Sequence, residues 1–260
     1  MEDQTGMGTV GKAVSLLEML GRGAPETTLA DLARRAGFDK ATTRRLLVSL
    51  IEHGLVEQDE TTRLYRLGAG IARLALMREA QFPFLRMAVP LVEQLAAETG
   101  ETVHLSEYSK RGLISVHVIE SAKANRVSVQ LGEVLPMHAT ASGIAFLAFT
   151  EEHVRAGVLA GPLPAFTPYT IGDAETLAEH IAATRARGHS TGSQGYEEGV
   201  LSVAAPILGA DGLAIGTIAV AAPRVRIQKG DIERHGASVA TAARGISERL
   251  FGRLPGRKRA

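Results

Sequence analysis

The segment from residue 39 to residue 54 restricts the possible folds of this chain more than any other. Asp39 is a favoured residue at the start of a helix, and Gly54 is favoured directly after the end of one. At about 100° per residue, the apolar side chains of this predicted helix gather on one side and the cationic side chains on the other. One face therefore belongs in a core, and the other in solvent or against a polyanion. The inward set is Thr43, Leu46, Leu47 and Leu50, and the outward set is Ala41, Arg44, Arg45 and Val48.

Two more helices are predicted before this one. Apolar residues at helical spacing run through 9–21, and a second run from Thr28 to Gly37 starts with a capping threonine. The turn between the second and third helices, Ala36-Gly37-Phe38, is short and contains a glycine, which a helix-turn-helix needs at this place.

A small hairpin is predicted after the third helix. Two short strand-like runs, 55–57 and 63–67, flank the polar run 59–62. Three helices followed by a hairpin is the element order of a winged helix-turn-helix. We therefore predict such a domain at residues 1–67, with the hairpin as its wing.

Local charge favours DNA binding, although the whole chain is nearly neutral, with 29 Lys and Arg against 28 Asp and Glu. Residues 34–45 contain five cations and one acid, a net charge of +4. Such a cluster neutralises phosphates, and arginine holds guanine by two hydrogen bonds, worth roughly 1–3 kcal/mol of discrimination. The residues predicted to meet DNA are Lys40, Ala41, Thr42, Arg44 and Arg45 on the third helix and Arg63 on the wing. Two alternatives stay open: a solvated helix face, or a sensor module whose helix-turn-helix contacts only proteins.

A second domain with mixed elements is predicted beyond a linker helix at 68–81, with the boundary at Phe82-Pro83. Helices and strand-like runs alternate over residues 82–250, which indicates a sheet flanked by helices and an α+β fold. The predicted helices are 85–99, 141–149, 174–187 and 231–250, and the predicted strands are 102–108, 113–119, 126–131, 201–208 and 213–221. The last ten residues, 251–260, form a basic tail that either lies in solvent or touches DNA.

The apolar run from Val203 to Pro223 is long enough to cross a membrane. Pro206 and Gly209 interrupt it, and Asp211-Gly212 between two β-branched runs favours a hairpin of two buried strands. The first four residues are polar and acidic, unlike a secretory signal, and cysteine is absent. We therefore predict a cytoplasmic protein without disulfides and without a membrane partner.

The chain resembles the IclR family of transcription regulators, and the resemblance covers nearly all of it. No single segment decides the matter, but their joint order and spacing are specific. In the first domain the matching segments are 13–18, 29–33, 36–37, 40–47, 54–56 and 65–68. In the second domain they are Thr99-Gly100-Glu101-Thr102-Val103-His104-Leu105, the run 135–143 that contains His138-Ala139-Thr140, and 199–206.

The resemblance implies a GAF-like effector-binding domain and a regulator, repressor or activator, of double-stranded DNA operators. It also implies homodimers or dimers of dimers, and an effector that is an organic acid or an aromatic metabolite. The effector-binding residues it implies are Leu135, Ala141, Ser142, Gly143, Ser202, Ala219 and Ala221. A helix start there would offer free N–H groups to a carboxylate.

The chain departs from the family pattern at several pocket positions. Ile144 replaces a common lysine, and Ser202 replaces a cysteine found in some members. Alanines stand at 219 and 221, where some members have serines. These changes favour a larger or partly apolar acid. As an alternative, Ala141-Ser142-Gly143 serves only close helix packing.

The sequence supports an enzyme or a metal-binding protein less well than a DNA-binding regulator. The glycine pattern of residues 6–11 matches a dinucleotide fingerprint, but no strand precedes it. Thr191-Gly192-Ser193-Gln194-Gly195 lacks the first glycine of a nucleophile elbow. The histidines at 104, 117 and 138 have no metal-ligand spacing. We predict no catalytic residues, no metal site and no cofactor.

Overall fold

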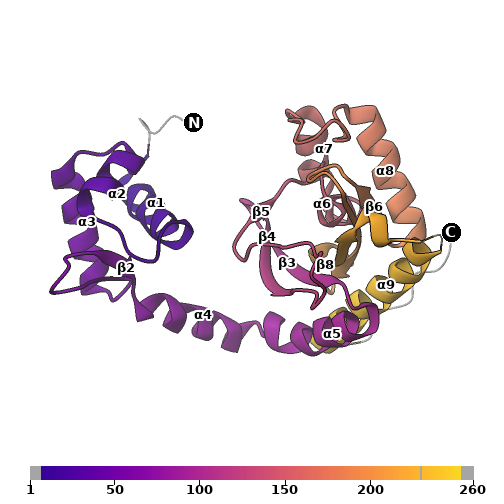
Figure 1. The fold of residues 1–260 in the computed structure, drawn as a ribbon, viewed down its shortest axis with the longest axis horizontal. Helices are drawn as coiled ribbons and strands as arrows, with labels where there is room; N and C mark the ends of the chain where they lie inside the picture. The colour runs from indigo at the N-terminus through magenta and orange to yellow at the C-terminus, as the bar shows by residue number, and fades with distance from the viewer. Residues whose placement is uncertain (1–6, 229, 253–260) are drawn as a thin grey trace. The chain divides into compact units, whose positions relative to one another are not determined.

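The computed structural model describes residues 7–228 and 230–252, and its contacts divide the chain into two compact units after Phe82 (Figure 1). The division falls at the predicted break between Phe82 and Pro83. Each unit has its own core and is described separately below. Of the predicted basic tail, only Phe251 and Gly252 are among the described residues.

The first unit begins with three helices and a hairpin, in the predicted order, and a fourth helix follows them. Two of the helices start at side-chain caps. Thr28 accepts a hydrogen bond from the Asp31 N–H, and Asp39 accepts one of 2.8 Å from the Thr42 N–H. Leu16, Leu32 and Leu47 are among the fully buried core residues. The elements are α1 (Thr9–Arg22), α2 (Leu29–Ala36), α3 (Lys40–Glu52), β1 (Val56–Gln58) and β2 (Tyr65–Leu67).

The wing is a tight loop organised by one carboxylate. Asp59 accepts hydrogen bonds from the N–H groups of Thr61 and Thr62, at 2.9 and 2.7 Å, and these bonds lower the pKa of Asp59. The turn closes at Arg63, whose φ of 62° lies in the left-handed region that residues other than glycine rarely adopt. The predicted DNA contact on the wing therefore stands at a fixed corner of the loop.

The helix α4 (Ala69–Gln81) follows Gly68 and has no buried residue among those described. Its three large exposed apolar side chains are Leu74, Leu76 and Met77, with exposed fractions of 47 %, 71 % and 50 %. A helix that buries nothing within its own unit gains little from its apolar side chains in a monomer.

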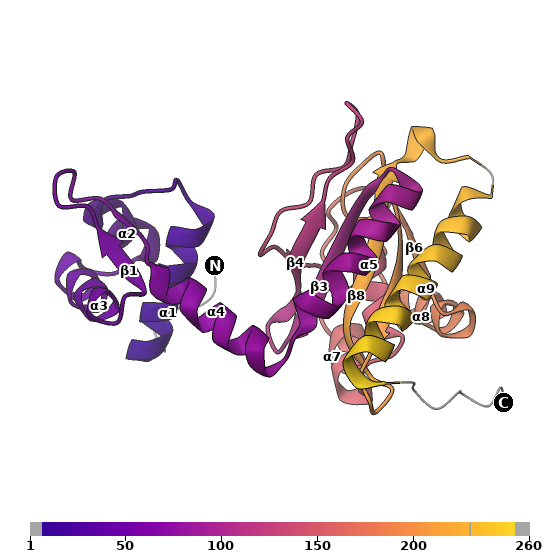
Figure 2. The same ribbon diagram turned by 90° about the horizontal axis from the view of Figure 1, so that it is seen from below.

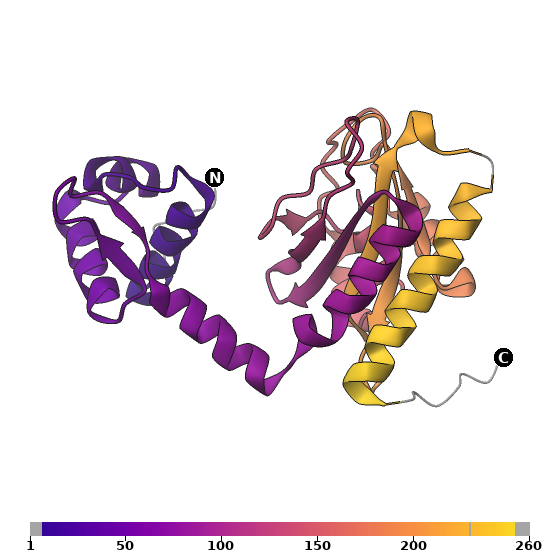
Figure 3. The ribbon, with the colours of Figure 1, turned by 60° about the horizontal axis from the view of Figure 1, so that its bottom comes forward.

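In the second unit, six described strands form one antiparallel sheet with the order β5-β4-β3-β8-β7-β6. Its helices are α5 (Phe84–Thr99), α6 (Ala141–Leu147), α7 (Glu152–Ala160), α8 (Ala174–Arg187) and α9 (Asp231–Phe251). Figures 2 and 3 show α5 and α9 side by side against one face of the sheet. The helix α6 packs on β7 and β8 and also contacts α8. The strands are β3 (Thr102–Ser109), β4 (Gly112–Ile119), β5 (Val134–Leu135), β6 (Ser190–Ser193), β7 (Val200–Leu208) and β8 (Ala214–Pro223).

The long apolar run is a hairpin, as predicted. The strands β7 and β8 pair antiparallel, and Gly212 at the turn has a φ of 77°. In the described part of the chain, no helix is both long and apolar enough to cross a membrane.

The predicted strand at residues 126–131 is wrong. This stretch is an irregular loop, because β4 pairs with the two-residue strand β5 instead. The Val127 carbonyl accepts its hydrogen bond from the Thr102 side chain at 2.6 Å rather than from a neighbouring strand. Three of the helices and strands named above were not predicted: α7, the two-residue strand β5, and the edge strand β6, whose sequence Ser-Thr-Gly-Ser shows no apolar alternation.

The short helix α6 packs closely because its residues are small. A Cβ atom at Gly143 would lie 2.3 Å from both the Cα and the carbonyl oxygen of Met137, so only glycine fits there. Ala141 and Ala145 form a tight cluster with Ala204 of β7 and Ala219 of β8. Small side chains thus let this helix approach both the sheet and the preceding loop.

Two helical glycines of this unit give opposite expectations for substitution by alanine. Gly143→Ala is expected to lower the free energy of unfolding by about 2 kcal/mol or more, because the Met137 backbone must move. Gly157→Ala in α7 meets no atom within 4 Å and should raise it by about 0.5–1 kcal/mol. Urea unfolding of both variants checks this, and a stable Gly143→Ala protein would contradict the packing described.

Candidate functional site

The outward face of α3 is fixed by buried residues on its other side. Thr43 is fully buried and donates a hydrogen bond of 2.9 Å to the Asp39 carbonyl. Three predicted DNA-contact residues at the helix start differ in exposure: Lys40 and Ala41 are exposed, and Thr42 is half-buried. Arg44 and Arg45 follow on the same helix, and both are exposed.

The cations near α3 fall into two groups. Arg34 and Arg35 of α2 both form ion pairs with Asp31, the latter at 3.7 Å. The Arg34 hydrogen bond is the largest cause of the lowered pKa of Asp31. The sequence count of charge over 34–45 left out this acid, so it overstated the free positive charge of α2. The second group is the four cations predicted to meet DNA, Lys40, Arg44, Arg45 and Arg63, which form no ion pair with any described residue.

The second unit contains a cavity of about 450 Å³ at the start of α6. Its wall combines the sheet, the loop before β5, and the segment between β6 and β7. Five of the seven residues predicted to bind an effector lie on this wall: Leu135, Ala141, Ser142, Ser202 and Ala221. Their chain positions are far apart, and the pairing of β7 with β8 places Ser202 opposite Ala221.

The other two predicted residues do not line the cavity. Gly143 faces the Met137 backbone, and its N–H donates a hydrogen bond of 3.0 Å to the Thr140 side chain. Ala219 is fully buried and packs with Ala141 behind the wall. At these two positions the structure supports the packing alternative.

Sequence reasoning missed the residues that come from irregular segments. The loop residues 127–130 and Glu133 form one side of the wall, and Phe166 and residues 194–197 form another. Irregular loops have no periodicity, so no pattern in the sequence pointed to these positions. Of the adjacent acids Glu197 and Glu198, only Glu197 lines the cavity.

His104 forms part of the cavity wall where β3 meets α6. Its Nε2 lies 3.1 Å from the Ser142 hydroxyl, and only 6 % of the residue is exposed. Burial lowers the pKa of the imidazole to about 4, so His104 is neutral at pH 7. It therefore offers a ligand a hydrogen bond and no charge.

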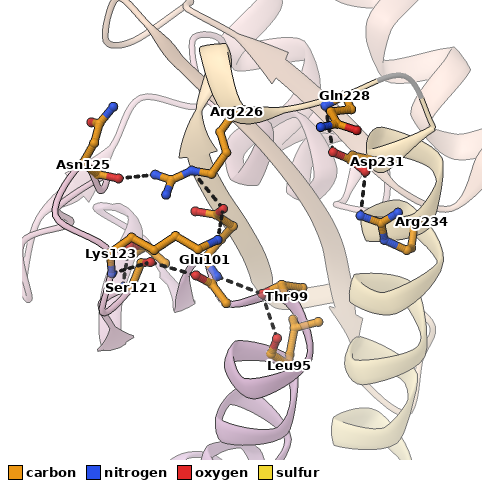
Figure 4. A network of polar contacts seen from close by, with 12 residues as sticks. Leu95, Thr99, Glu101, Ser121, Lys123, Asn125, Arg226, Gln228, Asp231 and Arg234 are labelled. Carbon is orange, nitrogen blue, oxygen red and sulfur yellow. Dashed lines mark hydrogen bonds and ion pairs between the residues drawn. The ribbon is translucent and has the colours of Figure 1, made fainter.

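A buried carboxylate fixes the loop that forms one side of the cavity. Glu101 at the start of β3 accepts from Lys123 at 2.7 Å and pairs with Arg226 at 3.2 Å, both through Oε1 (Figure 4). Arg226 also donates to the Asn125 carbonyl. Because Lys123 and Asn125 belong to the loop after β4, these contacts hold the backbone that continues into Val127 and the cavity wall.

The described residues include no candidate metal site, and the two glycine motifs noted in the sequence lack the structural setting that each enzyme motif needs. None of their His, Asp and Glu groups could hold a metal ion. Gly8 begins α1 and Gly11 lies within it, so the glycine pattern is a helix start rather than a strand-to-helix turn. Ser193 ends an edge strand that leads to another strand, whereas a nucleophile elbow leads into a helix.

Buried His104 predicts a pH dependence of stability. Its pKa falls from about 6.5 in the unfolded chain to about 4 in the folded one, so the unfolded chain binds more protons between these values. Its contribution to the free energy of unfolding is complete above pH 6.5 and is lost, by about 3 kcal/mol at most, as the pH falls towards 4.

Urea unfolding of the wild type and His104→Asn at pH 7.5, 6 and 4.5 measures this effect. The other histidines are the same in both proteins, so the difference between the two curves isolates His104. If the free energies of unfolding of the two proteins change with pH in the same way, His104 is not a buried imidazole that stays neutral at pH 7.

Comparison with known proteins assigns both units. Residues 80–248 match the model of the bacterial transcriptional regulator IclR C-terminal domain, and residues 9–60 match the IclR helix-turn-helix domain. A solved structure of an IclR transcriptional regulator from a Silicibacter species is 40 % identical, with a TM-score of 0.84, and covers 95 % of this chain and 98 % of its own.

Two curated relatives match over nearly their whole length. The glycerol operon regulatory protein of Streptomyces coelicolor is 28 % identical over 92 % of this chain and 94 % of its own. The transcriptional repressor IclR of Escherichia coli is 29 % identical over 91 % of this chain and 87 % of its own. The fold class expected from the sequence, a helix-turn-helix domain followed by an α/β domain, is confirmed by these matches.

Proposed function

Because the chain belongs to the IclR family of transcriptional regulators, we propose that the exposed face of α3 reads its operator. The free cations on this face carry the proposal. Arg44 and Arg45 are exposed and have no ion pair among the described residues, whereas the neighbouring Arg34 and Arg35 are occupied by Asp31. An arginine without an internal partner is free to donate two hydrogen bonds to guanine.

The other predicted contacts take supporting roles. Lys40 at the helix start lies where a recognition helix meets DNA, and the small side chains of Ala41 and Thr42 allow the backbone to approach. Arg63 at the wing corner contacts phosphate or the minor groove. The protein then acts in the cytoplasm on double-stranded DNA, as repressor or activator according to where its operator lies.

Removing a free arginine tests the DNA-reading face. Arg45→Ala is expected to weaken operator binding by roughly 1–3 kcal/mol, about 5- to 150-fold in Kd, with the fold unchanged. The operator is obtained by selecting duplexes from a random pool, and Kd is measured by fluorescence anisotropy at several salt concentrations.

Arg34→Ala is the matched control, because it removes an exposed arginine that is already paired with Asp31. It should leave the operator Kd within about twofold of wild type. Unchanged binding by Arg45→Ala, or equal losses in both variants, would favour the alternative of a helix-turn-helix that contacts only proteins.

We also propose that the protein acts as a homodimer or a dimer of dimers. Partly palindromic operators need two recognition helices, and α4 supplies apolar surface for an interface. Leu74, Leu76 and Met77 are half to mostly exposed, and α1 exposes Val10 at 77 %. Exposed apolar side chains of this size on two helices of one unit are typical of an interaction surface.

Charge on α4 tests this interface. The double variant Leu74→Glu and Met77→Glu is expected to shift the dimer to monomer in sedimentation equilibrium, since burying two carboxylates costs far more than the contacts return. Ala72→Glu adds a charge at another exposed position of α4 and serves as control. A dimer that survives the double variant would place the interface elsewhere.

Control by an effector is proposed to act from the cavity. A ligand that binds one dimer geometry more tightly shifts the population and changes the distance between the two recognition helices. The aromatic part of the expected effector class is supported by Phe166 and Tyr196, whose rings line the cavity. That the effector is an organic acid stays a prediction. No catalytic step is proposed.

A further inference from the structure

The cavity wall has an unusual charge for a site expected to hold an acid. Two carboxylates, Glu133 and Glu197, line it, and among the described lining residues there is no lysine and no arginine. Among the described lining residues, His104 has the only side-chain nitrogen that could carry a positive charge, and burial keeps its imidazole neutral at pH 7. A ligand carboxylate would find no opposite charge on this wall, and it would face two like charges.

Three cations close in sequence to the cavity wall have partners elsewhere. Arg126 pairs with Glu120 at 2.9 Å, and Lys123 pairs with buried Glu101 at 2.7 Å. Arg187 donates to the His189 carbonyl at 2.7 Å and to the Thr191 side chain at 3.2 Å. None of these three lines the cavity.

An aromatic pair lies beside the carboxylates. The rings of Phe166 and Tyr196 meet edge to face, with centroids 5.0 Å apart and an interplanar angle of 73°. The Tyr196 hydroxyl donates a hydrogen bond of 2.5 Å to Glu133 Oε1. This bond raises the pKa of Tyr196 to about 12, so the ring stays neutral while Glu133 remains an acceptor.

His104 adds a buried polar group to the cavity wall. His104 lines the cavity with 6 % of its surface exposed, and its Nδ1 has no hydrogen-bond partner in the described part of the chain. A buried ring nitrogen without a partner costs free energy that a bound molecule can restore. The cavity wall therefore combines carboxylate acceptors, aromatic rings, a neutral hydrogen-bonding group and apolar surface from Val127, Leu135 and Val200.

We infer that this cavity takes a ligand with a cationic nitrogen, a primary amine or a quaternary ammonium group, attached to an apolar body. Carboxylates neutralise such a charge, and aromatic faces attract it through their quadrupoles. The inference rests on the proposed function, because it names the chemical class of the effector in the same cavity. It replaces the expected organic acid by a molecule of opposite charge.

A matched pair of ligands tests the charge directly. Phenethylamine and 3-phenylpropionate have similar size and an identical ring but opposite charges, and choline adds a quaternary ammonium. Isothermal titration of the full-length protein at pH 7 measures each Kd. The amine or choline is expected to bind at least tenfold more tightly than the acid. Equal or tighter binding of the acid, or no binding by either cation, overturns the inference.

Variants then locate the charge and separate the two hypotheses. Glu133→Gln and Glu197→Gln should each weaken binding of the cation about fivefold or more, and Val129→Trp should block the cavity. Glu198→Gln is the control, because Glu198 is an exposed acid adjacent to Glu197 that does not line the cavity. This variant should bind the cation with wild-type affinity. Wild-type affinity in both glutamine variants overturns the inference.

Operator binding measured by anisotropy with and without the cation reports on the proposed function alone. A cation that binds in the cavity without changing operator affinity supports the inference and contradicts effector control from this site. An acid that binds there and changes operator affinity does the reverse.

Discussion

The close packing of α6 on the sheet is the constraint on which the second unit depends. Four alanines, two from the helix and one each from β7 and β8, allow the approach, and Gly143 allows the loop before the helix to cross at van der Waals distance. This packing sets where the helix begins. The start of α6 then forms the cavity wall and holds Ser142 within reach of His104. A larger side chain in this layer would move the wall as well as the core.

The sequence predicted those parts of the protein that rest on periodicity and local chemistry. The helix α3 was foreseen from its two caps and its two-sided pattern, and the hairpin of β7 and β8 from Asp211-Gly212. For residues 126–131 the same approach gave a wrong prediction, because the apolar residues of this loop alternate as they do in a strand. Its carbonyl at Val127 is instead bound by the Thr102 side chain, a contact between residues 25 positions apart. No local rule includes such a partner.

The candidate sites show the same division. The free arginines of α3 were predicted correctly as exposed, yet their distinction from Arg34 and Arg35 depended on Asp31, one turn outside the charge cluster that had been counted. In the cavity, the family resemblance pointed to residues on regular elements, and five of them lie on the wall. The residues that decide its charge, Glu133 and Glu197, come from loops whose path follows only from the assembled sheet.

The buried carboxylate of Glu101 joins two segments that are distant in the chain. One oxygen is shared by Lys123 from the cavity loop and Arg226 from the turn after β8, and the second oxygen has no hydrogen-bond partner among the described residues. Since one oxygen serves both cations, a shift of either segment alters the attraction felt by the other. Glu101 is thus a common anchor, and neither the loop after β4 nor the turn after β8 can move away without losing its contact to the same carboxylate oxygen.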